Sequence, residues 1–235
     1  NEDIDPVLLT KSLNAENKSW DNKVSTVALP PQFQMILADI DAGSHTPTLV
    51  SQVLKWRKEQ PEEANQLWDE LDYYNSRVEQ HFRDLTLAAE TDDIGYKNAI
   101  AEVVDLPVSQ WEKIQDHTKV HQFLIELAAD FTKVRHLLQK MSQATNVPIE
   151  PSEQTQLLDQ CMEVPGTIMA GVPGAGGYDA IFCIVLSEEA KDGVHRIWEQ
   201  WSLCNVSPLL CQADSTGITN IDPNSSTGAI CLKRA

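Results

Sequence analysis

The sequence predicts an α+β protein in which a sheet is covered by a layer of helices. Short apolar segments with strand character occur near both ends of the chain, at 33–40 and after residue 165. Between them, from about 46 to 145, apolar residues recur at the three- and four-residue spacing of helices. Because separated runs of strands and helices form α+β layers, we expect the late strands to pair with one another beneath the helices.

The charge balance of the chain limits its partners. Its 235 residues include 35 acidic and 18 basic side chains, which gives a formal net charge of −17. A broad basic face is unexpected in such a chain, so we expect neither nucleic acid nor a membrane surface as a partner. No apolar stretch reaches the length of a membrane span, and no basic-then-apolar leader is present. An anionic ligand would have to be held by local features such as backbone N–H groups.

The cysteines indicate a reducing compartment. There are five of them, an odd number, and none shows C-x-x-C spacing. We therefore expect reduced, mostly packed thiols in a cytoplasmic protein. The chain begins with Asn1 rather than Met, and we expect it to be a piece of a longer protein.

The first elements are a strand and a capped helix. The apolar segment 33–40 reads as a buried strand, and 24–29 as a shorter one. Thr46 is a good N-cap residue and Pro47 suits the first helical position, so a helix should run from here to near Pro61.

The middle of the chain predicts three further helical stretches. Apolar spacing indicates a long helix over 62–89, a shorter one over 92–104 that Pro107 ends, and another over 109–142 with a break near Asp116.

After a two-proline connector the pattern changes. We expect a short helix within 146–162, strands at 166–172 and 180–187, a helix at 188–201 and a strand in 206–214. The Ser-, Thr-, Asn- and Gly-rich end of the chain resembles a loose tail.

Glycines are concentrated in "GVPGAGGYDA", between the two strands at 166–172 and 180–187. The chain has ten glycines, and Gly171, Gly174, Gly176 and Gly177 fall within seven positions. Such a cluster requires positive φ angles or a close approach to the backbone. Successive N–H groups in this turn could bind phosphate, whereas the alternative is a structural hairpin. The stretch is neither a Walker loop nor a dinucleotide fingerprint, and Asp179 could orient the turn, lie near a metal or accept backbone N–H bonds.

Other polar residues allow a structural or a ligand-binding interpretation. Asn75 falls on the line Leu71, Val78, Phe82, so we expect it to face inward, where it bonds internally or faces a cavity. Ser44, His45 and Thr46 precede a helix, and Gln154 and Thr155 begin another. Capping is the simpler interpretation of these hydroxyl and amide groups.

The histidines give little sign of catalysis. His117 and His121 have i,i+4 spacing, but without a third ligand a solvated pair is the expectation. The sequence has neither an H-E-x-x-H motif nor a G-x-S-x-G nucleophile elbow, so hydrolase chemistry is unsupported.

Four stretches in this order carry a family resemblance: "LADIDAGSHTPTLVSQVLKW", "LDYYNSRVEQ", "IEPSEQTQLLD" and "MAGVPGAGGYDAIF". Together they resemble the C-terminal half of eukaryotic phosphomevalonate kinases, of the GHMP kinase superfamily, over about residues 20–210. The resemblance implies a GHMP kinase C-terminal domain at 46–235, an antiparallel sheet covered by helices, preceded at 1–45 by the last strands of the N-terminal domain. It also implies phosphorylation of 5-phosphomevalonate to 5-diphosphomevalonate with ATP and Mg²⁺, in the mevalonate pathway of isoprenoid and sterol biosynthesis.

The resemblance also names candidate site residues. The Gly-rich turn would hold the substrate phosphate and the transferring phosphoryl group, while a Gly-Ser-x-Thr turn, an Asn-Ser pair and a Gln-Thr pair would shape the pocket. The candidate substrate- and phosphate-binding residues are Gly174, Ala175, Gly176, Gly177, Asp179, Ser44, Thr46, Asn75, Ser76, Gln154 and Thr155. No catalytic or metal-binding residue is assigned within this chain.

Two departures from the family qualify this interpretation. Ser152 replaces the second proline of the family's Glu-Pro-Pro. The family's Gly-Ser-rich nucleotide loop has no counterpart, so we expect ATP and Mg²⁺ to be bound mainly by an N-terminal domain in cis, and this chain alone to be inactive.

Alternatives remain open at this stage. One is another GHMP kinase, for mevalonate or homoserine, and the other is a non-catalytic binding module derived from a kinase half. The chain ends in "LKRA" without Ser-Lys-Leu. A peroxisomal location nevertheless stays open beside the cytoplasmic one.

Overall fold

The fold was examined in a computed structural model, which describes residues 5–14, 27–40 and 46–211. Ser44, His45 and the predicted tail from residue 215 lie outside the described residues. The described part of the predicted strand over 24–29, residues 27–29, is not a strand.

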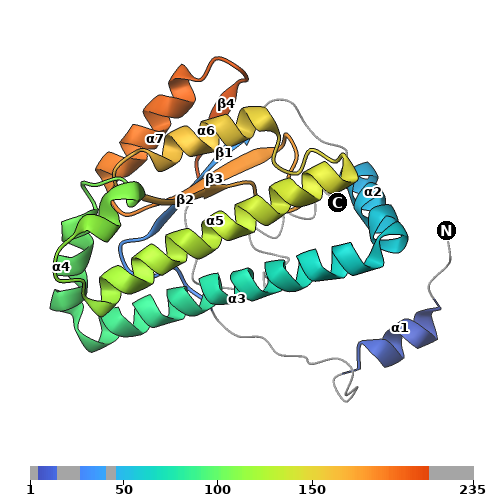
Figure 1. Cartoon of the computed structure of the whole chain (residues 1–235), viewed down its shortest axis with the longest axis horizontal. Coiled ribbons are helices and arrows are strands. Elements are labelled where there is room, and N and C mark those ends of the chain that lie inside the picture. The colour runs from blue at the N-terminus through green and yellow to red at the C-terminus, as the bar shows by residue number, and fades with distance from the viewer. Residues whose placement is uncertain (1–4, 15–26, 41–45, 212–235) are drawn as a thin grey trace, which may run out of the picture.

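Four strands form one antiparallel sheet in the order β2-β3-β1-β4 (Figure 1). The strands are β1 (Gln34–Ile40), β2 (Thr167–Gly171), β3 (Ala180–Val185) and β4 (Val206–Leu209). Their positions confirm the predicted α+β class and all four strands expected at these places. The pairing differs in one respect, because β4 bonds to β1 instead of to another late strand. The boundary placed after residue 45 stays a prediction, although β1 lies inside this sheet.

The predicted helices all form, and their bounds follow the sequence signals closely. The break predicted near Asp116 is present, and this residue has a positive φ of 58°. The helical elements are α1 (Pro6–Ser12), α2 (Thr46–Glu59), α3 (Pro61–Thr91), α4 (Asp93–Val103), the 3₁₀ helix η1 (Val108–Lys113), α5 (Lys119–Thr145), α6 (Ser152–Met162) and α7 (Glu188–Gln200). Only α1, which lies apart from the body in Figure 1 and buries no residue, was not predicted.

Helices cover both faces of the sheet. On one face, Ile181 and Cys183 of β3 pack in a cluster with side chains of α6 and α7. On the other face, Ile184 of β3 and Met169 of β2 pack with α3, α4 and α5. A third cluster joins α2, α3 and α5 and contains Ile149 from the connector before α6. Since β3 alternates its side chains between two cores, it is buried on both sides.

The sequence predicts that the two histidines at the start of α5 form a solvated pair, and this prediction is wrong. His117 is exposed, but His121 is fully buried. The Nδ1 atom of His121 accepts the Thr118 N–H at 3.2 Å, and the Thr118 hydroxyl accepts the His121 N–H at 3.3 Å. This reciprocal arrangement is a capping box, so His121 has a structural role. Among the described residues, no group of three or more His, Cys, Asp or Glu side chains is placed to hold a metal ion.

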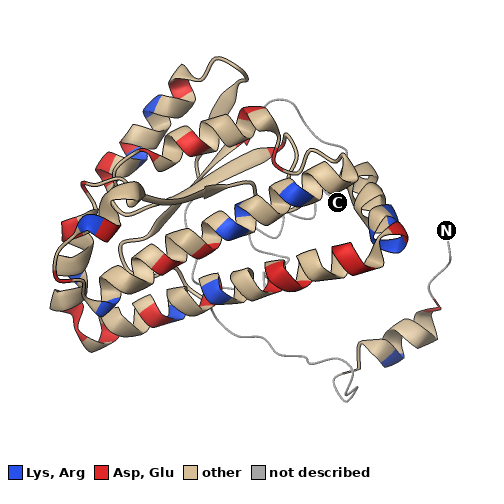
Figure 2. Cartoon of the chain, viewed as in Figure 1, with Lys and Arg blue, Asp and Glu red and all other residues tan. Residues whose placement is uncertain are grey.

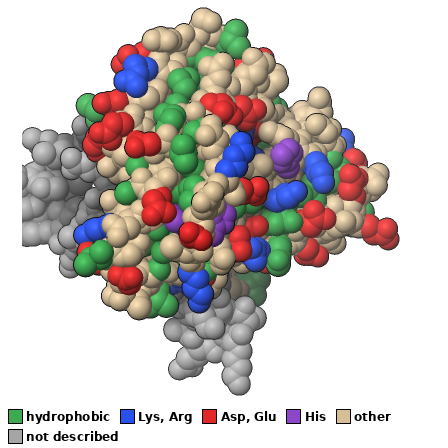
Figure 3. Space-filling view, turned by 60° about the vertical axis from the view of Figure 1, so that its left-hand side comes forward, with side chains coloured by type: hydrophobic (Ala, Val, Ile, Leu, Met, Phe, Trp, Pro, Cys, Tyr) green, Lys and Arg blue, Asp and Glu red, His purple; other side chains and the backbone are tan. Residues whose placement is uncertain are grey.

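Charged residues are spread over the helices. No helix in the described part of the chain is long and apolar enough to cross a membrane. Figure 2 shows acidic and basic residues along both α3 and α5, with the first half of α3 carrying acidic residues alone. On the face drawn in Figure 3 they are likewise interspersed, without a continuous basic patch. The four cysteines of the described residues are free thiols, and burial raises the pKa of Cys183 well above its usual range.

A polar cluster joins the two long helices α3 and α5. The Arg77 Nε–H of α3 donates to Asp130 Oδ2 of α5 at 2.6 Å, and His81 Nε2 lies 2.8 Å from the same oxygen. The Asp130 residue is only 8% exposed, while Glu126, which also contacts Arg77, is exposed. The hydrogen bond to Asp130 raises the pKa of Arg77. Asp130 is therefore the central acceptor of this helix pair.

We expect Asp130→Asn to lower the free energy of unfolding by about 1–3 kcal/mol, because Arg77 and His81 both lose their ionised acceptor. The matched control is Glu126→Gln, which removes the same charge from an exposed partner of Arg77 and should change stability by less than about 0.5 kcal/mol. Urea unfolding at pH 7, followed by circular dichroism, measures both. Equal losses in the two variants would show that the buried position of Asp130 is unimportant.

Candidate functional site

The Gly-rich turn connects β2 to β3, and its glycines have two different reasons to be present. Gly174, Gly176 and Gly177 have φ angles of 63°, 73° and 93°, as the cluster predicted. These left-handed conformations are costly for residues with a Cβ atom. Gly171 has no positive φ, but a Cβ there would lie 2.8 Å from Cζ of Phe131. Backbone conformation explains three of the glycines, and close approach of a ring explains the fourth.

Only part of the turn offers free N–H groups. The Gly176 N–H donates to the Pro173 carbonyl at 3.2 Å, and the Gly177 N–H donates to the Ile149 carbonyl at 2.8 Å. Both glycines are buried. The N–H groups of Gly174 and Ala175, by contrast, donate no hydrogen bond in the part of the chain that the structure describes, and both residues are exposed. Gly174 and Ala175 thus supply the donors that an anion could use.

Two other segments hold the turn in place. The carbonyl of Asp179, at its end, accepts the N–H of Ile40 at 2.9 Å, so the chain leaves β1 beside the turn. The second support is the connector 146–151, between α5 and α6. Its residue Ile149 accepts from Gly177, and the Ile149 N–H donates to the Ser142 hydroxyl of α5 at 3.1 Å. The turn is consequently fixed to β1 on one side and to the connector on the other.

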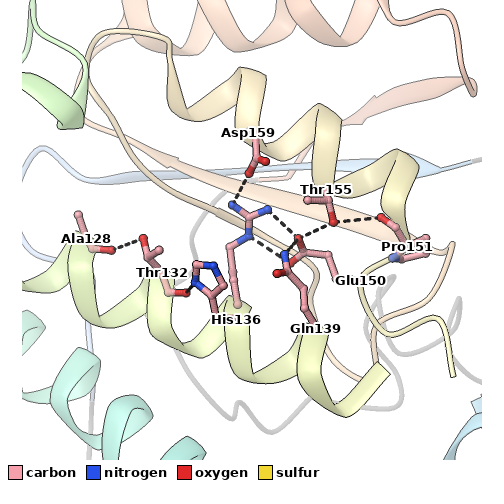
Figure 4. A network of polar contacts seen from close by, with 9 residues as sticks. Ala128, Thr132, His136, Gln139, Glu150, Pro151, Thr155 and Asp159 are labelled. Atoms are coloured by element: carbon pink, nitrogen blue, oxygen red, sulfur yellow. Dashed lines mark hydrogen bonds and ion pairs between the residues drawn. The ribbon is translucent and has the colours of Figure 1, made fainter. Parts of the chain in front are cut away.

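Glu150, next to Ile149, is the centre of a buried polar network (Figure 4). Its side chain is 0% exposed and accepts from Arg135 Nε–H at 3.1 Å and Nη2–H at 2.7 Å. Gln139 donates to Oε1 of Glu150 at 2.8 Å, and the Thr155 hydroxyl donates to the same oxygen at 3.0 Å. Arg135 also reaches the exposed Asp159 at 3.0 Å. Burial lowers the pKa of Arg135, but the hydrogen bond and the charge of Glu150 outweigh it, so that the pKa is raised.

The first turn of α6 carries a buried amide without a partner. Gln154 is 1% exposed, and in the described part of the chain neither its Nε2 nor its Oε1 makes a hydrogen bond. Helix α6 packs along β2 on the sheet, and the chain reverses direction between the two, so the start of α6 lies toward the end of β2 that leads into the Gly-rich turn. A buried amide without partners costs stability, which makes Gln154 a candidate to receive a ligand.

Capping, the simpler interpretation of this pair, is wrong for α6. The helix has Pro151 as its N-cap and no side-chain cap hydrogen bond. The Thr155 hydroxyl donates to Glu150 instead, and its oxygen also lies 3.3 Å from the Pro151 carbonyl oxygen. The structure thus separates the two neighbours: the amide of Gln154 is unpartnered, whereas the hydroxyl of Thr155 is engaged internally.

The predicted inward position of Asn75 is wrong. Asn75 and Ser76 are exposed, and the Asn75 amide donates to the Leu71 carbonyl of its own helix at 2.9 Å. Four residues turn an α-helix about 40° beyond a full turn, so the line from Leu71 leaves the core at Asn75. Leu71 and the partly buried Tyr74 nevertheless pack in the cluster that contains Ile149. This part of α3 therefore borders the connector 146–151, which holds the turn in place. Thr46 begins α2, and Ser44 lies outside the described residues.

The sequence did not single out Arg135 or Glu150. The sequence did carry a signal for Arg135, because this residue stands in an otherwise apolar stripe of α5. It follows Val134, and Leu137 comes two residues later; both of these neighbours are buried. Charged residues in such positions are rarely buried without a partner. Glu150 belongs to the Glu-Pro sequence before α6, a motif that carries no signal of burial.

Comparison with known proteins identifies a domain and a set of homologues. Residues 123–202 match the family described as GHMP kinases C terminal. The chain is 36% identical over 205 residues to a peroxisomal phosphomevalonate kinase of Arabidopsis thaliana. The alignment covers 85% of this chain and 39% of that protein. It is 37% identical over 179 residues to a phosphomevalonate kinase of Candida albicans, covering 76% of this chain and 36% of that protein. The chain therefore spans less than two fifths of the length of these relatives.

The fold also occurs in a solved structure. The crystal structure of a Lin0012 protein from Listeria innocua superimposes with a TM-score of 0.50 at 16% sequence identity, covering 80% of this chain and 41% of that one. At this level of identity the similarity establishes the fold alone.

We expect two glycine variants of the turn to differ sharply. In Gly176→Ala the new Cβ would overlap the Ile149 carbonyl oxygen, and the free energy of unfolding should fall by at least about 3 kcal/mol. Gly174→Ala is the matched control, because Gly174 also has a positive φ but nothing lies within 4 Å of its Cβ position. Its cost should be about 1–2 kcal/mol, from backbone conformation alone. Thermal and urea unfolding of both variants measure the difference, and similar losses would contradict the close packing of Gly176 on the connector.

Proposed function

Since this chain contains a GHMP kinase C-terminal domain and is homologous over most of its length to phosphomevalonate kinases, we propose that it is the C-terminal part of such an enzyme. In this proposal the whole protein transfers a phosphoryl group from ATP to 5-phosphomevalonate and forms 5-diphosphomevalonate. Residues 1–45 would end the N-terminal domain, and 46–235 would form the C-terminal one.

The unpaired polar groups of the candidate site support the proposal most strongly. The chain is strongly acidic, with a net charge of −17, yet the substrate carries a phosphate. The N–H groups of Gly174 and Ala175 donate no hydrogen bond within the described residues and could hold this phosphate without a positive side chain. Gln154, buried and unpartnered at the start of α6, could supply an amide N–H for the same ligand. Both elements are bound to the connector 146–151, through Gly177 and Thr155.

The remaining candidate residues have secondary roles in the proposal. Gly176 and Gly177 shape the turn, and Asp179 fixes its end to β1 through its carbonyl. Asn75 and Ser76 are exposed on α3 beside the third cluster and stay candidate substrate-binding residues. Thr46, at the start of α2, and Ser44, outside the described residues, are candidates from the family resemblance. Thr155 orients the connector through Glu150.

Phosphoryl transfer depends on positioning and on neutralising the charge of the transferred group. A Mg²⁺ ion supplies this neutralisation in ATP-dependent kinases. Within the described residues, no group of three or more His, Cys, Asp or Glu side chains is placed to hold a metal ion. We place the groups for ATP and Mg²⁺ in the N-terminal domain of the whole protein, in cis, and expect the 235-residue chain alone to be inactive. The location in the proposal is cytoplasmic, with the peroxisome as the alternative because the Arabidopsis relative is named peroxisomal.

We expect this chain to bind 5-phosphomevalonate with at least about tenfold higher affinity than mevalonate, because only the former carries the anion that the free N–H groups could hold. Isothermal titration calorimetry on the chain measures both affinities. Gly176→Val should abolish the preference, because its side chain would displace the connector from the turn. Equal binding of the two compounds by the unmodified chain would contradict the phosphate site.

A second variant separates ligand binding from stability. Gln154→Met removes a buried amide without partners, so the free energy of unfolding should rise by about 1 kcal/mol while the affinity for 5-phosphomevalonate falls about tenfold. Gln156→Met, on the exposed side of the same helix, is the control and should change neither quantity appreciably. Urea unfolding and calorimetry provide the two measurements. A loss of stability in Gln154→Met with unchanged affinity would show that Gln154 is an ordinary core residue.

A further inference from the structure

The ion pair of Arg135 and Glu150 is an unusual feature of this core. Their side chains are 10% and 0% exposed. Taking two charges out of water costs about as much as their attraction returns, so a buried pair seldom adds net stability. A pair of this kind can instead specify one geometry, because each partner accepts only a few arrangements of its hydrogen bonds.

The geometry that Glu150 specifies is that of the connector 146–151. Both of its oxygens accept from Arg135 of α5, and one also accepts from Gln139, one helical turn further along. Glu150 is thereby held by residues of a long, rigid helix. Its neighbour Ile149 shares a peptide unit with it, so Ile149 follows any movement of the Glu150 backbone.

Ile149 transmits this position to the Gly-rich turn. Its carbonyl accepts the Gly177 N–H at 2.8 Å and is so close to Gly176 that no Cβ fits there. The turn cannot shift toward the connector without overlap, and it cannot shift away without breaking this hydrogen bond. The placement of the free N–H groups of Gly174 and Ala175 therefore depends on where Ile149 lies.

The same carboxylate also reaches the first turn of α6. The Thr155 hydroxyl donates to Oε1 of Glu150, and Thr155 directly follows the unpartnered Gln154. Figure 4 shows Gln139, Thr155 and Asp159 arranged around this network. One buried carboxylate is thus hydrogen-bonded to the first turn of α6 and linked to the Gly-rich turn through the carbonyl of the neighbouring Ile149.

We infer that Glu150, held by Arg135, is a positioning residue that sets the Gly-rich turn relative to the first turn of α6. It acts through Ile149 and Thr155 and needs no contact with a ligand. The coupling itself stands on the contacts above, whereas its importance for phosphate binding rests on the proposed function.

The test compares Glu150→Gln with Asp159→Asn. Both replace a carboxylate that binds Arg135 by its isosteric amide, but Asp159 is 62% exposed at the outer end of the guanidinium, away from the connector. Hydrogen–deuterium exchange by NMR on this chain follows the Gly177 amide, with the buried Leu124 amide of α5 as the internal reference. Glu150→Gln should speed exchange at Gly177 about tenfold relative to Leu124, while Asp159→Asn should leave the ratio within twofold.

Kinetics on the full-length protein provide the second readout. Glu150→Gln should raise the KM for 5-phosphomevalonate about tenfold and change kcat less than threefold, because a displaced turn weakens ground state and transition state alike. Asp159→Asn should change neither constant by more than about twofold. Gln139→Met, which removes one donor to Glu150 and leaves the ion pair intact, should move the exchange ratio and KM in the same direction by a smaller factor.

An unchanged Gly177 ratio in both Glu150→Gln and Gln139→Met overturns the inference. Parallel acceleration at Gly177 and Leu124 also overturns it, because it would show that the network only stabilises the fold. If Glu150→Gln does not fold, the Gln139→Met exchange ratio decides. Absence of turnover in the unmodified full-length protein would count against the proposed function, and the exchange ratio would still decide the positioning role.

Discussion

The insertion of β1 between β3 and β4 is the constraint on which the rest of the fold depends. Within the described residues β4 pairs only with β1, so without β1 the sheet would lose an edge strand as well as a central one. The same strand places its last residue, Ile40, against the carbonyl of Asp179. A segment from early in the chain is thereby joined to the end of the Gly-rich turn. The candidate site and the sheet are consequently parts of one hydrogen-bonded unit.

The buried polar groups of this protein fall into two kinds. Asp130 and Glu150 each accept hydrogen bonds from side chains of neighbouring elements, and such networks rigidify a core. Gln154 is as deeply buried, yet its amide has no partner in the described part of the chain. Proteins tolerate the free-energy cost of an unsatisfied buried polar group mainly where a ligand forms the missing hydrogen bonds. The contrast between the engaged carboxylate of Glu150, in the connector 146–151, and the amide of Gln154, in the helix that follows it, supports the proposed site in this region.

An acidic protein that handles a phosphorylated substrate has to solve an electrostatic problem. The overall field of this chain repels anions, so a phosphate must be held by short-range, oriented dipoles. In the proposed site, the N–H groups of Gly174 and Ala175 would meet that need, provided that the turn is rigid, because mobile dipoles would have to be ordered at the moment of binding. The hydrogen bonds of Gly176 and Gly177 supply this rigidity, whereas the N–H groups of Gly174 and Ala175 donate to no other described residue. The chain spans less than two fifths of its relatives, so the remaining charge neutralisation would come from other parts of the whole protein.

The sequence by itself determined the helices from α2 to α7, the strands at 33–40, 166–172, 180–187 and 206–214, the break near Asp116 and the positive φ angles of the turn. These features depend on local periodicity and on single residues, which act over a few positions. The four family stretches likewise marked the Gly-rich turn and the Gln154–Thr155 pair. Only the tertiary structure decided that β1 lies beside β4, that Asn75 is exposed, and that Gln154 has no hydrogen-bond partner among the described residues while Thr155 binds Glu150. Pairing, burial and hydrogen-bond satisfaction depend on residues that are distant in the sequence, and a local pattern carries no information about which of them meet.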